Sequence, residues 1–327
     1  MIAPRVLLGD VGGTNTRLEL IGPDRGQRHL ATFRNSDFAS FEDLLVAFLA
    51  TQGGPVCAQI ILAIAAPISG TSIRLTNCQW QIDADRIRTA TQAKTVRLIN
   101  DLEALALSIS TLPTSAVRHI FGPAEPAEPL GRTLVLGTGT GFNAACALHP
   151  AQLNVLPAEC GHMTLPVETE DDLRLRHHLA QGRGRASVER ALSGQGLIEI
   201  YQWVAQSRGL DPENLTAPQI ATQAVQNADP CCVKAAMIVL RILGTVCGDL
   251  ALAYLPHGGI YLAGSVVRAL APLITTSDFA AELTKKGRQT HLMQSFTVQL
   301  ITQDSAALIG CARLVQPHPK ATAVLIP

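Results

Sequence analysis

The sequence lacks an excess of charge of either sign, because Lys and Arg together number 26 and Asp and Glu also number 26. A chain whose formal net charge is zero has no overall electrostatic field that would attract nucleic acid or an anionic membrane surface. We therefore expect no nucleic acid and no membrane among its partners, although a local basic patch is compatible with this balance.

Cysteine patterns typical of metal sites or disulfide frameworks are also absent. The eight cysteines are scattered, no Cys-x-x-Cys pair occurs, and only Cys231 and Cys232 are adjacent. Such spacing is typical of reduced and mostly buried thiols, and it excludes a zinc finger or a disulfide-stapled scaffold.

Neither a signal peptide nor a membrane span is predicted. The first ten residues have no long apolar core and no cleavage site. The most apolar later stretch, residues 231–255, is interrupted by Lys234, Arg241 and Asp249. Lys234 and Arg241 lie on one face of a helix, so the pattern predicts an amphipathic helix of a globular protein. We expect the chain to be cytoplasmic.

Apolar sequence is present in sufficient amount for two hydrophobic cores, since 47% of the 327 residues are hydrophobic. Short β-rich runs alternate with helical patterns, which indicates an α/β protein. Residues 122–131 are rich in Pro and Glu, lack periodicity, and are predicted to be a surface connection between domains. The predicted strands are 6–8, 17–21, 60–65, 96–99, 133–136 and 143–148, and a helix is predicted over 102–109.

A glycine-rich turn at residues 9–15 is the first segment that indicates chemistry. Glycines without a Cβ let backbone N–H groups approach phosphate oxygens, hydroxyl and amide side chains add donors, and a strand-end carboxylate can hold hydrated Mg²⁺. An ordinary hairpin turn with Asp and Asn as turn formers explains the same residues, and both interpretations stay open here. The candidate phosphate ligands are Gly12, Gly13, Thr14 and Asn15, with Asp10 as the candidate Mg²⁺ residue.

A second glycine- and threonine-rich turn favours phosphate binding over a bulged hairpin. Three glycines alternate with two threonines between two predicted strands, and glycine loses more chain entropy on folding than any other residue. The segment is not a P-loop, because no Gly-Lys-Ser/Thr follows. Its candidate nucleotide-binding residues are Gly137, Thr138, Gly139, Thr140 and Gly141.

A third glycine cluster spans residues 258–265 and includes Gly264. It would accommodate a nucleotide base or allow close packing of a strand against a helix, and packing is favoured when the cluster is taken alone. The turns at Gly9 and Gly137 lie 128 positions apart, so each half of the chain opens with a similar hairpin. This spacing suggests a structural duplication, with one nucleotide held between two domains.

The candidate base, Asp101, lies where a predicted strand ends and a predicted helix begins, the place at which open α/β sheets bind ligands. A carboxylate there can accept a proton from a hydroxyl that attacks the γ-phosphate. Helix capping explains the same residues, because Asn100 and Glu103 have capping-box spacing and Asp101 suits a helix N-terminus. By position alone, capping is favoured.

A polar cluster follows the apolar residues 155–158. Glu159 and His162 enclose two small residues and are suited to gripping neighbouring hydroxyl groups. A structural ion pair, or a partial metal site with Cys160, are the alternatives, and the metal site is the weakest because zinc spacing is missing. Glu189 lies near a predicted helix end, where its alternative role is a surface pair with Arg185.

With these residues assembled, the chain resembles the bacterial glucokinase family, the non-repressor branch of the actin-like sugar kinases. The likeness runs in order over nearly the whole length, and the order of seven motifs makes it specific. The motifs are Gly9–Asn15, Ala65–Gly70, Ile99–Asp101, Gly137–Gly141, Glu159–His162, Glu189–Gly194 and Gly258–Gly264.

The resemblance implies a two-lobed actin-like ATPase (ribonuclease H-like) fold of the α/β class, with the active site in an interdomain cleft. It implies a small lobe of residues 1–108, completed by roughly 303–327, and a large lobe of residues 109–302. It also implies phosphorylation of glucose by ATP with Mg²⁺, and a homodimer.

Site roles come from the same resemblance. Asn100, Asp101, Glu159, His162 and Glu189 match the family's sugar-binding positions, and Asp101 matches its general base. The two phosphate turns and Gly264 match its nucleotide-binding positions. An alcohol is a poor nucleophile, so such an enzyme must align its oxygen with the γ-phosphate and accept its proton late in transfer.

Three positions depart from the family pattern. Asn143 stands where glycine is usual, which is expected to narrow the nucleotide's approach. Cys160 replaces a glycine between the sugar-binding Glu and His, which is expected to alter the sugar pocket. Residues 304–307 replace the usual Asn-Pro-Gly turn. None of these changes removes a catalytic group.

Two further functions stay open. The first is a kinase for another hexose or an amino sugar, because glucose and mannose differ only in the orientation of one hydroxyl. The second is a sugar- or nucleotide-binding sensor that no longer catalyses, although such a sensor is expected to have lost Asp101. An acyl-phosphate kinase is disfavoured because Glu159 and Glu189 would repel a carboxylate substrate.

Overall fold

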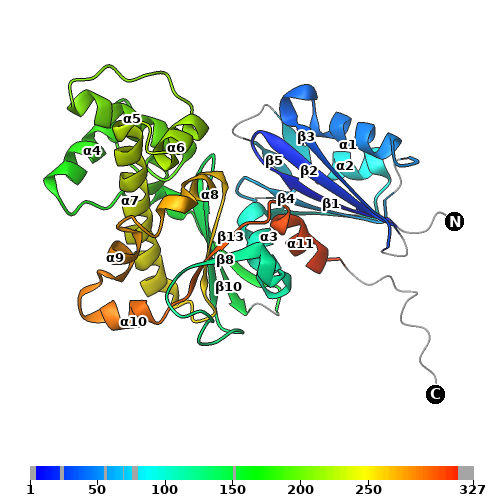
Figure 1. The fold of residues 1–327 in the computed structure, drawn as a ribbon. Coiled ribbons are helices and arrows are strands. Elements are labelled where there is room, and N and C mark those ends of the chain that lie inside the picture. Colours follow the sequence, from blue (N-terminus) through cyan, green and yellow to red (C-terminus); the bar gives the residue numbers. More distant parts are fainter. Residues whose placement is uncertain are drawn as a thin grey trace. The chain divides into compact units, whose positions relative to one another are not determined.

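The structure, a computed structural model, describes residues 5–22, 26–54, 57–68, 70–75, 80–149 and 152–315. The chain divides into two compact units (Figure 1). Unit 1 consists of residues 1–112 and 304–327, and unit 2 consists of residues 113–303. Residues 316–327, which were expected to help complete the small lobe, lie outside the described part.

Unit 1 is built on a five-stranded sheet with strand order β3-β2-β1-β4-β7. Strand β1 pairs antiparallel with β2 and parallel with β4, and β4 pairs parallel with β7. The strands are β1 (Val6–Val11), β2 (Asn15–Ile21), β3 (Arg28–Arg34), β4 (Gln59–Ile64) and β7 (Thr95–Asn100), with a separate pair β5 (Ser72–Arg74) and β6 (Gln81–Asp83).

The helices of unit 1 begin at recognisable caps. Ser40 accepts a hydrogen bond from the backbone N–H of Asp43, and Asp83 accepts from the backbone N–H groups of Asp85 and Arg86. The helices are α1 (Phe41–Ala50), α2 (Ala84–Thr91), α3 (Asp101–Ser108) and α11 (Ala306–Arg313). The predicted helix 102–109 is therefore confirmed, one residue earlier than expected.

Helix α11 returns to unit 1 and packs against α3 (Figure 1). The approach is so close that a Cβ at Gly310 would collide with the backbone carbonyl of Ala104. Arg313 donates to the carbonyl of Leu107 at 2.7 Å. The thiol of Cys311 is 3.8 Å from the carbonyl oxygen of Gly9 in β1. Helix α11 therefore fixes α3 against the sheet.

Unit 2 is built on a six-stranded sheet with order β11-β10-β9-β12-β13-β8. Strand β9 pairs antiparallel with β10 and parallel with β12, and β12 pairs parallel with β13. The strands are β8 (Val117–Phe121), β9 (Thr133–Thr138), β10 (Phe142–His149), β11 (Asn154–Pro157), β12 (Ile260–Ala263) and β13 (Val298–Ile301).

The two sheets repeat one pattern. In each sheet, five successive strands show two antiparallel pairings followed by two parallel ones. These strands are β3-β2-β1-β4-β7 in unit 1 and β11-β10-β9-β12-β13 in unit 2. The two glycine-rich hairpins occupy equivalent places, between β1 and β2 and between β9 and β10. The duplication suggested by the sequence spacing is present in the fold.

The helices of unit 2 surround the long helix α7 (Figure 1). They are α4 (Glu170–Ala180), α5 (Gly194–Ser207), α6 (Ala217–Val225), α7 (Pro230–Tyr254), α8 (Ser265–Leu270), α9 (Phe279–Thr284) and α10 (Thr290–Gln294). Helix α7 is long and apolar enough to span a membrane by composition, but 78% of its most apolar window is buried inside the protein. The helix predicted over 231–255 is present as α7, and most of its residues are buried.

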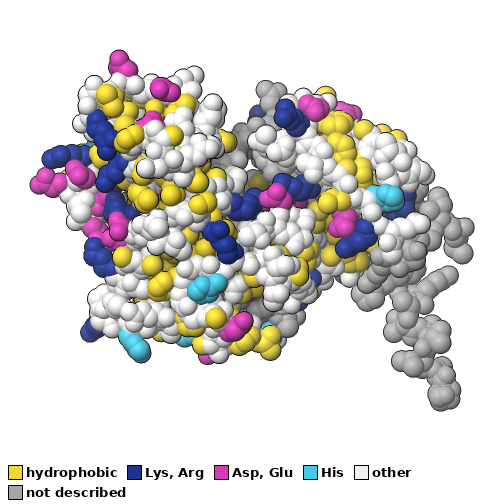
Figure 2. Space-filling view, viewed as in Figure 1, with side chains coloured by type: hydrophobic (Ala, Val, Ile, Leu, Met, Phe, Trp, Pro, Cys, Tyr) yellow, Lys and Arg dark blue, Asp and Glu magenta, His cyan; other side chains and the backbone are white. Residues whose placement is uncertain are grey.

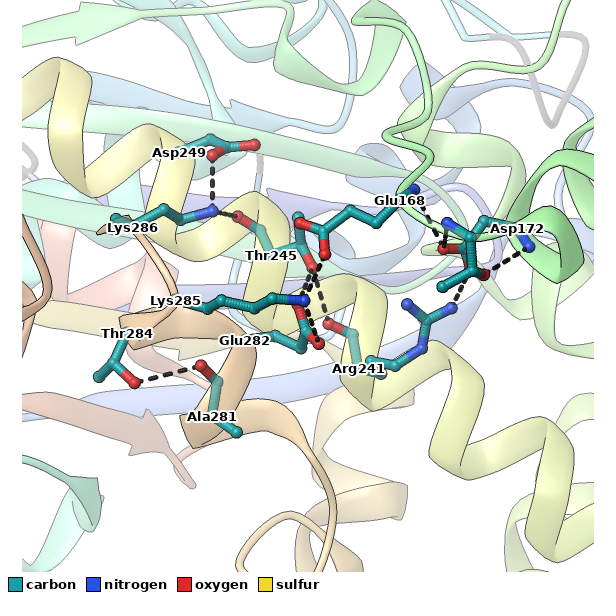
Figure 3. Close-up of polar contacts among 11 residues, drawn as sticks. Glu168, Asp172, Arg241, Thr245, Asp249, Ala281, Glu282, Thr284, Lys285 and Lys286 are labelled. Atoms are coloured by element: carbon teal, nitrogen blue, oxygen red, sulfur yellow. Dashed lines mark hydrogen bonds and ion pairs between the residues drawn. The ribbon is translucent and has the colours of Figure 1, made fainter. Parts of the chain in front are cut away.

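Two charged residues of α7 form ion pairs with other elements of unit 2 (Figure 3). Arg241 pairs with the buried Asp172 of α4. Lys286, just after α9, donates to Asp249 at 2.7 Å and to the backbone carbonyl of Thr245 at 3.1 Å. Asp172 and Lys286 are the buried members of these pairs, and a buried charge without a partner would be costly.

Charges of both signs are interspersed over the visible surface of the molecule (Figure 2). On this face Lys and Arg side chains alternate with Asp and Glu, as a formal net charge of zero leads one to expect.

Candidate active site

The first glycine-rich turn connects β1 to β2. The backbone N–H of Gly12 donates to the carbonyl of Asn15 at 3.0 Å, which closes the turn. Thr14 and Asn15 are exposed, whereas Gly12 and Gly13 are partly exposed. Strand β2 starts at Asn15, two residues earlier than predicted. The turn therefore presents backbone and polar side chains to solvent.

Asn35, which the sequence did not single out, supports this turn from beneath. Its side chain is only 3% exposed. Its Nδ2 donates to the carbonyl of Gly12 at 2.8 Å, and its Oδ1 accepts from the Thr16 hydroxyl at 2.8 Å. Its backbone N–H donates to the carbonyl of Thr14 at 2.9 Å. An Asn after a strand is typical of a turn, so only the structure shows this role.

Asp10 lies near the end of β1, directly opposite Arg17 of β2. The Arg17 guanidinium lies 3.3 Å from a carboxylate oxygen of Asp10, and their side chains are 28% and 15% exposed. Asp10 also raises the pKa of Asp101 by charge repulsion. Asp10 is therefore a partly buried carboxylate between a cation and a second acid.

Asp101 is the first residue of α3, immediately after β7. Burial raises the pKa of Asp101 to about 7, and the negative charge of Asp10 contributes to the rise, against opposing hydrogen bonds from Leu102 N–H and Asn100. A carboxyl group that titrates near neutral pH is matched to accepting a proton from an alcohol under physiological conditions. The position predicted for the base therefore has the electrostatics of one.

Asn100 is the N-cap of α3, so the capping interpretation is also correct. Its Oδ1 accepts from the backbone N–H of Leu102 at 3.0 Å, and its Nδ2 donates to the carbonyl of Ala66 at 3.2 Å. The cap bond goes to Leu102 rather than to Glu103, which differs from the predicted capping box. The cap holds the amide of Asn100 and the start of α3 in a fixed orientation.

The second glycine-rich turn connects β9 to β10. The backbone N–H of Gly139 donates to the carbonyl of Gly141 at 2.9 Å, and the carbonyl of Gly139 accepts from Gly194 N–H at 2.8 Å. Strand β9 continues through Gly137 and Thr138, so the turn is shorter than predicted. Thr140 is exposed at its tip. Thr140 is thus the threonine whose hydroxyl is accessible to a ligand.

Thr138 and Gly264 have structural roles in the same turn. Thr138 is 2% exposed, and its hydroxyl donates to the carbonyl of Ala263 at 3.3 Å. Gly264 has a φ of +106°, and a Cβ there would collide with the backbone of Thr138. Gly264, directly after β12, therefore allows close packing against the turn, as the packing interpretation of the third cluster expected.

Glu159 precedes the short 3₁₀ helix η4 (Cys160–His162), and His162 is its last residue. Nε2 of His162 lies 4.0 Å from Oε2 of Glu159, and the side chains of Glu159 and His162 are 53% and 70% exposed. A pair at this separation and exposure contributes little to stability. Both side chains are available to a ligand, which favours hydroxyl binding over a structural ion pair.

Glu189 lies in the 3₁₀ helix η5 (Val188–Arg190) and contacts the second turn. Its Oε2 accepts from the backbone N–H of Phe142 at 3.1 Å, and a Cβ at Gly141 would collide with its carboxylate. The suggested surface pair with Arg185 is wrong, because Arg185 donates to the carbonyl of His162 at 2.9 Å and to the Thr164 hydroxyl at 3.3 Å. Glu189 instead links η5 to the start of β10.

Cys160 was expected to alter the sugar pocket, and Asn143 was expected to narrow the nucleotide's approach. Their contacts in the structure are of another kind. The side chain of Cys160 is buried in the hydrophobic core of unit 2. The Oδ1 of Asn143 accepts from the backbone N–H of Cys160 at 2.9 Å. These two residues therefore support the segment that carries Glu159 and His162.

The predicted residues fall into two groups, one in each unit. Unit 1 brings together the first turn, Asp10, Asn100 and Asp101. Unit 2 brings together the second turn, Gly264, Glu189, and the segment of Glu159 and η4 that carries His162. Each unit thus combines one glycine-rich turn with polar residues suited to binding hydroxyl groups.

Comparisons with known proteins agree on one family. The family model described as Glucokinase matches residues 7–318. The glucokinase of Pectobacterium atrosepticum is 34% identical over 307 residues, covering 93% of this chain and 95% of that protein. The glucokinase of Nitrobacter hamburgensis is 33% identical over 328 residues, covering 96% and 98%.

Solved structures are similar over the same length. A glucokinase from an Antarctic psychrotroph has a TM-score of 0.78 and 29% identity, covering 94% of this chain and 97% of that one. A ROK family glucokinase from Streptomyces griseus, solved with glucose and AMPPNP, has a TM-score of 0.63 and 17% identity, covering 95% and 99%. The predicted fold class, the actin-like α/β fold of sugar kinases, is confirmed.

Proposed function

This chain belongs to the glucokinase family of ATP-dependent hexose kinases, which phosphorylate glucose, and we propose that Asp101 is its general base. One observation carries the proposal. Asp101 is the first residue after β7, and burial together with Asp10 raises its pKa to about 7. At neutral pH a large fraction of such carboxyl groups is ionised, and each of these can accept a proton.

The sugar's attacking hydroxyl gives its proton to the Asp101 carboxylate as its oxygen bonds to the γ-phosphorus and the bond to ADP breaks. Asn100 holds one hydroxyl through its remaining Nδ2 hydrogen. Glu159, His162 and Glu189 hold others, since all three present charged or polar atoms at exposed or partly exposed positions. Fixed hydroxyl contacts align the attacking oxygen, which supplies much of the rate enhancement in phosphoryl transfer.

The two glycine-rich turns hold the phosphates of ATP. Gly12, Gly13, Thr14 and Asn15 offer backbone and side-chain donors in unit 1. Gly137, Gly139, Thr140 and Gly141 do so in unit 2, where Thr138 and Gly264 fix the turn from inside. Oriented backbone N–H groups are favourable partners for phosphate oxygens.

Asp10 is the proposed Mg²⁺ residue, and the residues present fit this ion. Among the described residues no three His, Cys, Asp or Glu side chains form a metal-binding group. Mg²⁺ needs no such group, because it keeps several waters and binds one or two carboxylates together with substrate phosphates. A divalent cation would also offset the repulsion between Asp10 and Asp101. When bound, Mg²⁺ neutralises phosphate charge.

Further parts of the proposal concern the protein's state. We expect a homodimer, as is common in the family, and a cytoplasmic location. Light scattering coupled to size-exclusion chromatography measures the mass in solution. A mass of one chain, 34.7 kDa, would refute the dimer.

The test is ADP release from purified protein with Mg-ATP across glucose, mannose, fructose, glucosamine and N-acetylglucosamine. Asp101→Asn is expected to lower glucose-dependent kcat by roughly 10²- to 10⁴-fold, the range typical of general bases. Glu103→Gln, on the same helix, is the matched control and should keep most of the activity. Turnover with another sugar only would replace the substrate but keep the mechanism. Binding without turnover of any sugar would favour the sensor.

A further inference from the structure

Asn143 occupies the junction between the second glycine-rich turn and the sugar-binding segment. It is the second residue of β10 and lies directly opposite Gly137 of β9. Gly137 has no side chain, so the residue paired with Asn143 places no side chain against it. The preceding residue, Phe142, donates its backbone N–H to Glu189 at 3.1 Å. Two consecutive residues of β10, Phe142 and Asn143, therefore form hydrogen bonds with segments that carry proposed sugar-binding residues.

The amide of Asn143 has a defined orientation. One atom accepts from the backbone N–H of Ala144 at 2.8 Å and from that of Cys160 at 2.9 Å. Both partners are donors, so the accepting atom must be Oδ1 and not Nδ2. The side chain is partly buried, so this arrangement is not averaged over a freely rotating surface residue.

The Cys160 N–H is a group that needs an acceptor. Cys160 is the first residue of η4, and the first N–H groups of a helix have no partner within it. Glu159 is the N-cap of η4, but its side chain makes no capping hydrogen bond. Asn143, in strand β10, supplies that acceptor. The carboxylate of Glu159 is thereby left for substrate.

Backbone packing restrains the same segment. A Cβ at Gly161 would collide with the carbonyl of Phe142, so η4 lies directly against the start of β10. The side chain of Cys160 is buried in the core. Arg185 also donates to the carbonyl of His162 at the end of η4. The hydrogen bond that Asn143 accepts from Cys160 N–H is therefore the directional restraint at the start of η4, next to Glu159.

We propose that Asn143 is a positioning residue that caps η4 and so holds Glu159 and His162 in place for sugar binding. This inference rests on the proposed function of those two side chains. Asn143 was expected to narrow the nucleotide's approach, whereas its contacts lie with the segment that carries Glu159 and His162.

Asn143→Ala and Asn143→Gly both remove the acceptor, and the alanine variant is the less disruptive of the two because glycine weakens a strand. Each is expected to raise the KM for glucose about tenfold, as loss of a hydrogen bond to a buried donor does. The KM for ATP should change by less than about twofold, since the glycine-rich turn keeps its own bonds. Asn143→Asp keeps an acceptor oxygen and should restore most of the glucose affinity.

A structural readout accompanies the kinetics. Selective ¹⁵N labelling of cysteine gives amide signals from the eight cysteines, and Cys160→Ser identifies the signal of residue 160. Exchange of this amide with solvent should accelerate in Asn143→Ala and return toward the wild-type rate in Asn143→Asp. Asn154→Ala, an exposed Asn on β11, is the matched control and should change neither quantity.

Unchanged glucose KM and unchanged Cys160 exchange in Asn143→Ala would overturn the proposal. A raised KM without faster exchange would also overturn it, because Asn143 would then touch the substrate rather than position η4. If the wild-type protein shows no sugar-dependent turnover, the proposed function fails, but the exchange experiment still tests the cap. The two failures are therefore distinguishable.

Discussion

Replacing Asp101 by Asn should lower kcat strongly and at the same time stabilise unit 1. The pKa of Asp101 is raised from 3.8 to about 7 because its ionised form is buried and faces Asp10. The folded protein therefore disfavours the ionised carboxylate relative to the unfolded chain. Asn has nearly the same shape, keeps an oxygen that can accept from Leu102 N–H, and never ionises.

The direction in which stability changes with pH follows from proton linkage. Since the folded pKa is the higher one, the stability that Asp101 contributes is fully present below pH 3.8 and is lost as pH rises through about 7. A difference of about three pH units corresponds to at most roughly 4 kcal/mol above pH 8. Between pH 5 and pH 8 the advantage of Asp101→Asn should grow by about 2.6 kcal/mol.

Urea unfolding at several pH values between 5 and 8 measures this difference. The two tryptophans, Trp80 and Trp203, lie in different units. A Trp203→Phe background leaves the buried Trp80 as the fluorescent reporter of unit 1. The free energy of unfolding is then compared in that background between the chain that retains Asp101 and the chain that carries Asp101→Asn.

Asp83, also in unit 1, serves as the control because its pKa is shifted in the opposite direction. Hydrogen bonds from the backbone N–H groups of Arg86 and Asp85 lower the pKa of Asp83, so Asp83→Asn should show no pH-dependent difference between pH 5 and 8. If the advantage of Asp101→Asn is equally flat over this range, Asp101 has an ordinary pKa and the argument for it as a base near neutrality is refuted.

Three further substitutions test the supports of the site. Gly310→Ala drives a Cβ into the backbone of α3, which should lower the free energy of unfolding of unit 1 by roughly 1–3 kcal/mol, measured by urea unfolding. Gly264→Ala meets the backbone of Thr138 at a positive φ and should raise the KM for ATP at least several-fold, whereas an unchanged KM would contradict the packing role. Arg17→Ala removes the ion-pair partner of Asp10 and should raise the pKa of Asp101, so that the acidic limb of kcat/KM moves to higher pH; Arg17→Lys should largely restore the profile.

Much of the fold follows from local pattern. The predicted strands 60–65 and 96–99 correspond to β4 and β7, and the predicted helix at 231–255 corresponds to α7, because apolar runs and helical periodicity are local properties. Strand β8, by contrast, was missed. Its partner β13 lies far along the chain, and its own residues are mostly half-exposed.

The sequence offers candidate residues for the site but not the contacts that hold them in place. Asp101 could be found because a strand end followed by a helix start is visible in the sequence. The partner of Glu189, the N–H of Phe142, is 47 positions away, and that of Asn143 is 17 positions away. No periodicity connects such residues. The raised pKa of Asp101 also depends on burial, which the sequence does not give.

The contact between α11 and α3 has a consequence for synthesis on the ribosome. Helix α11 (Ala306–Arg313), which packs on the helix that starts at Asp101, is translated only after the whole of unit 2. Unit 2 must therefore emerge in full before unit 1 can be completed. A nascent or truncated chain that ends before Asp304 would carry every proposed substrate contact and yet leave its base on an unsupported helix. Premature products should thus be inactive, and the apolar surface that α11 covers in the finished protein should attract chaperones during translation.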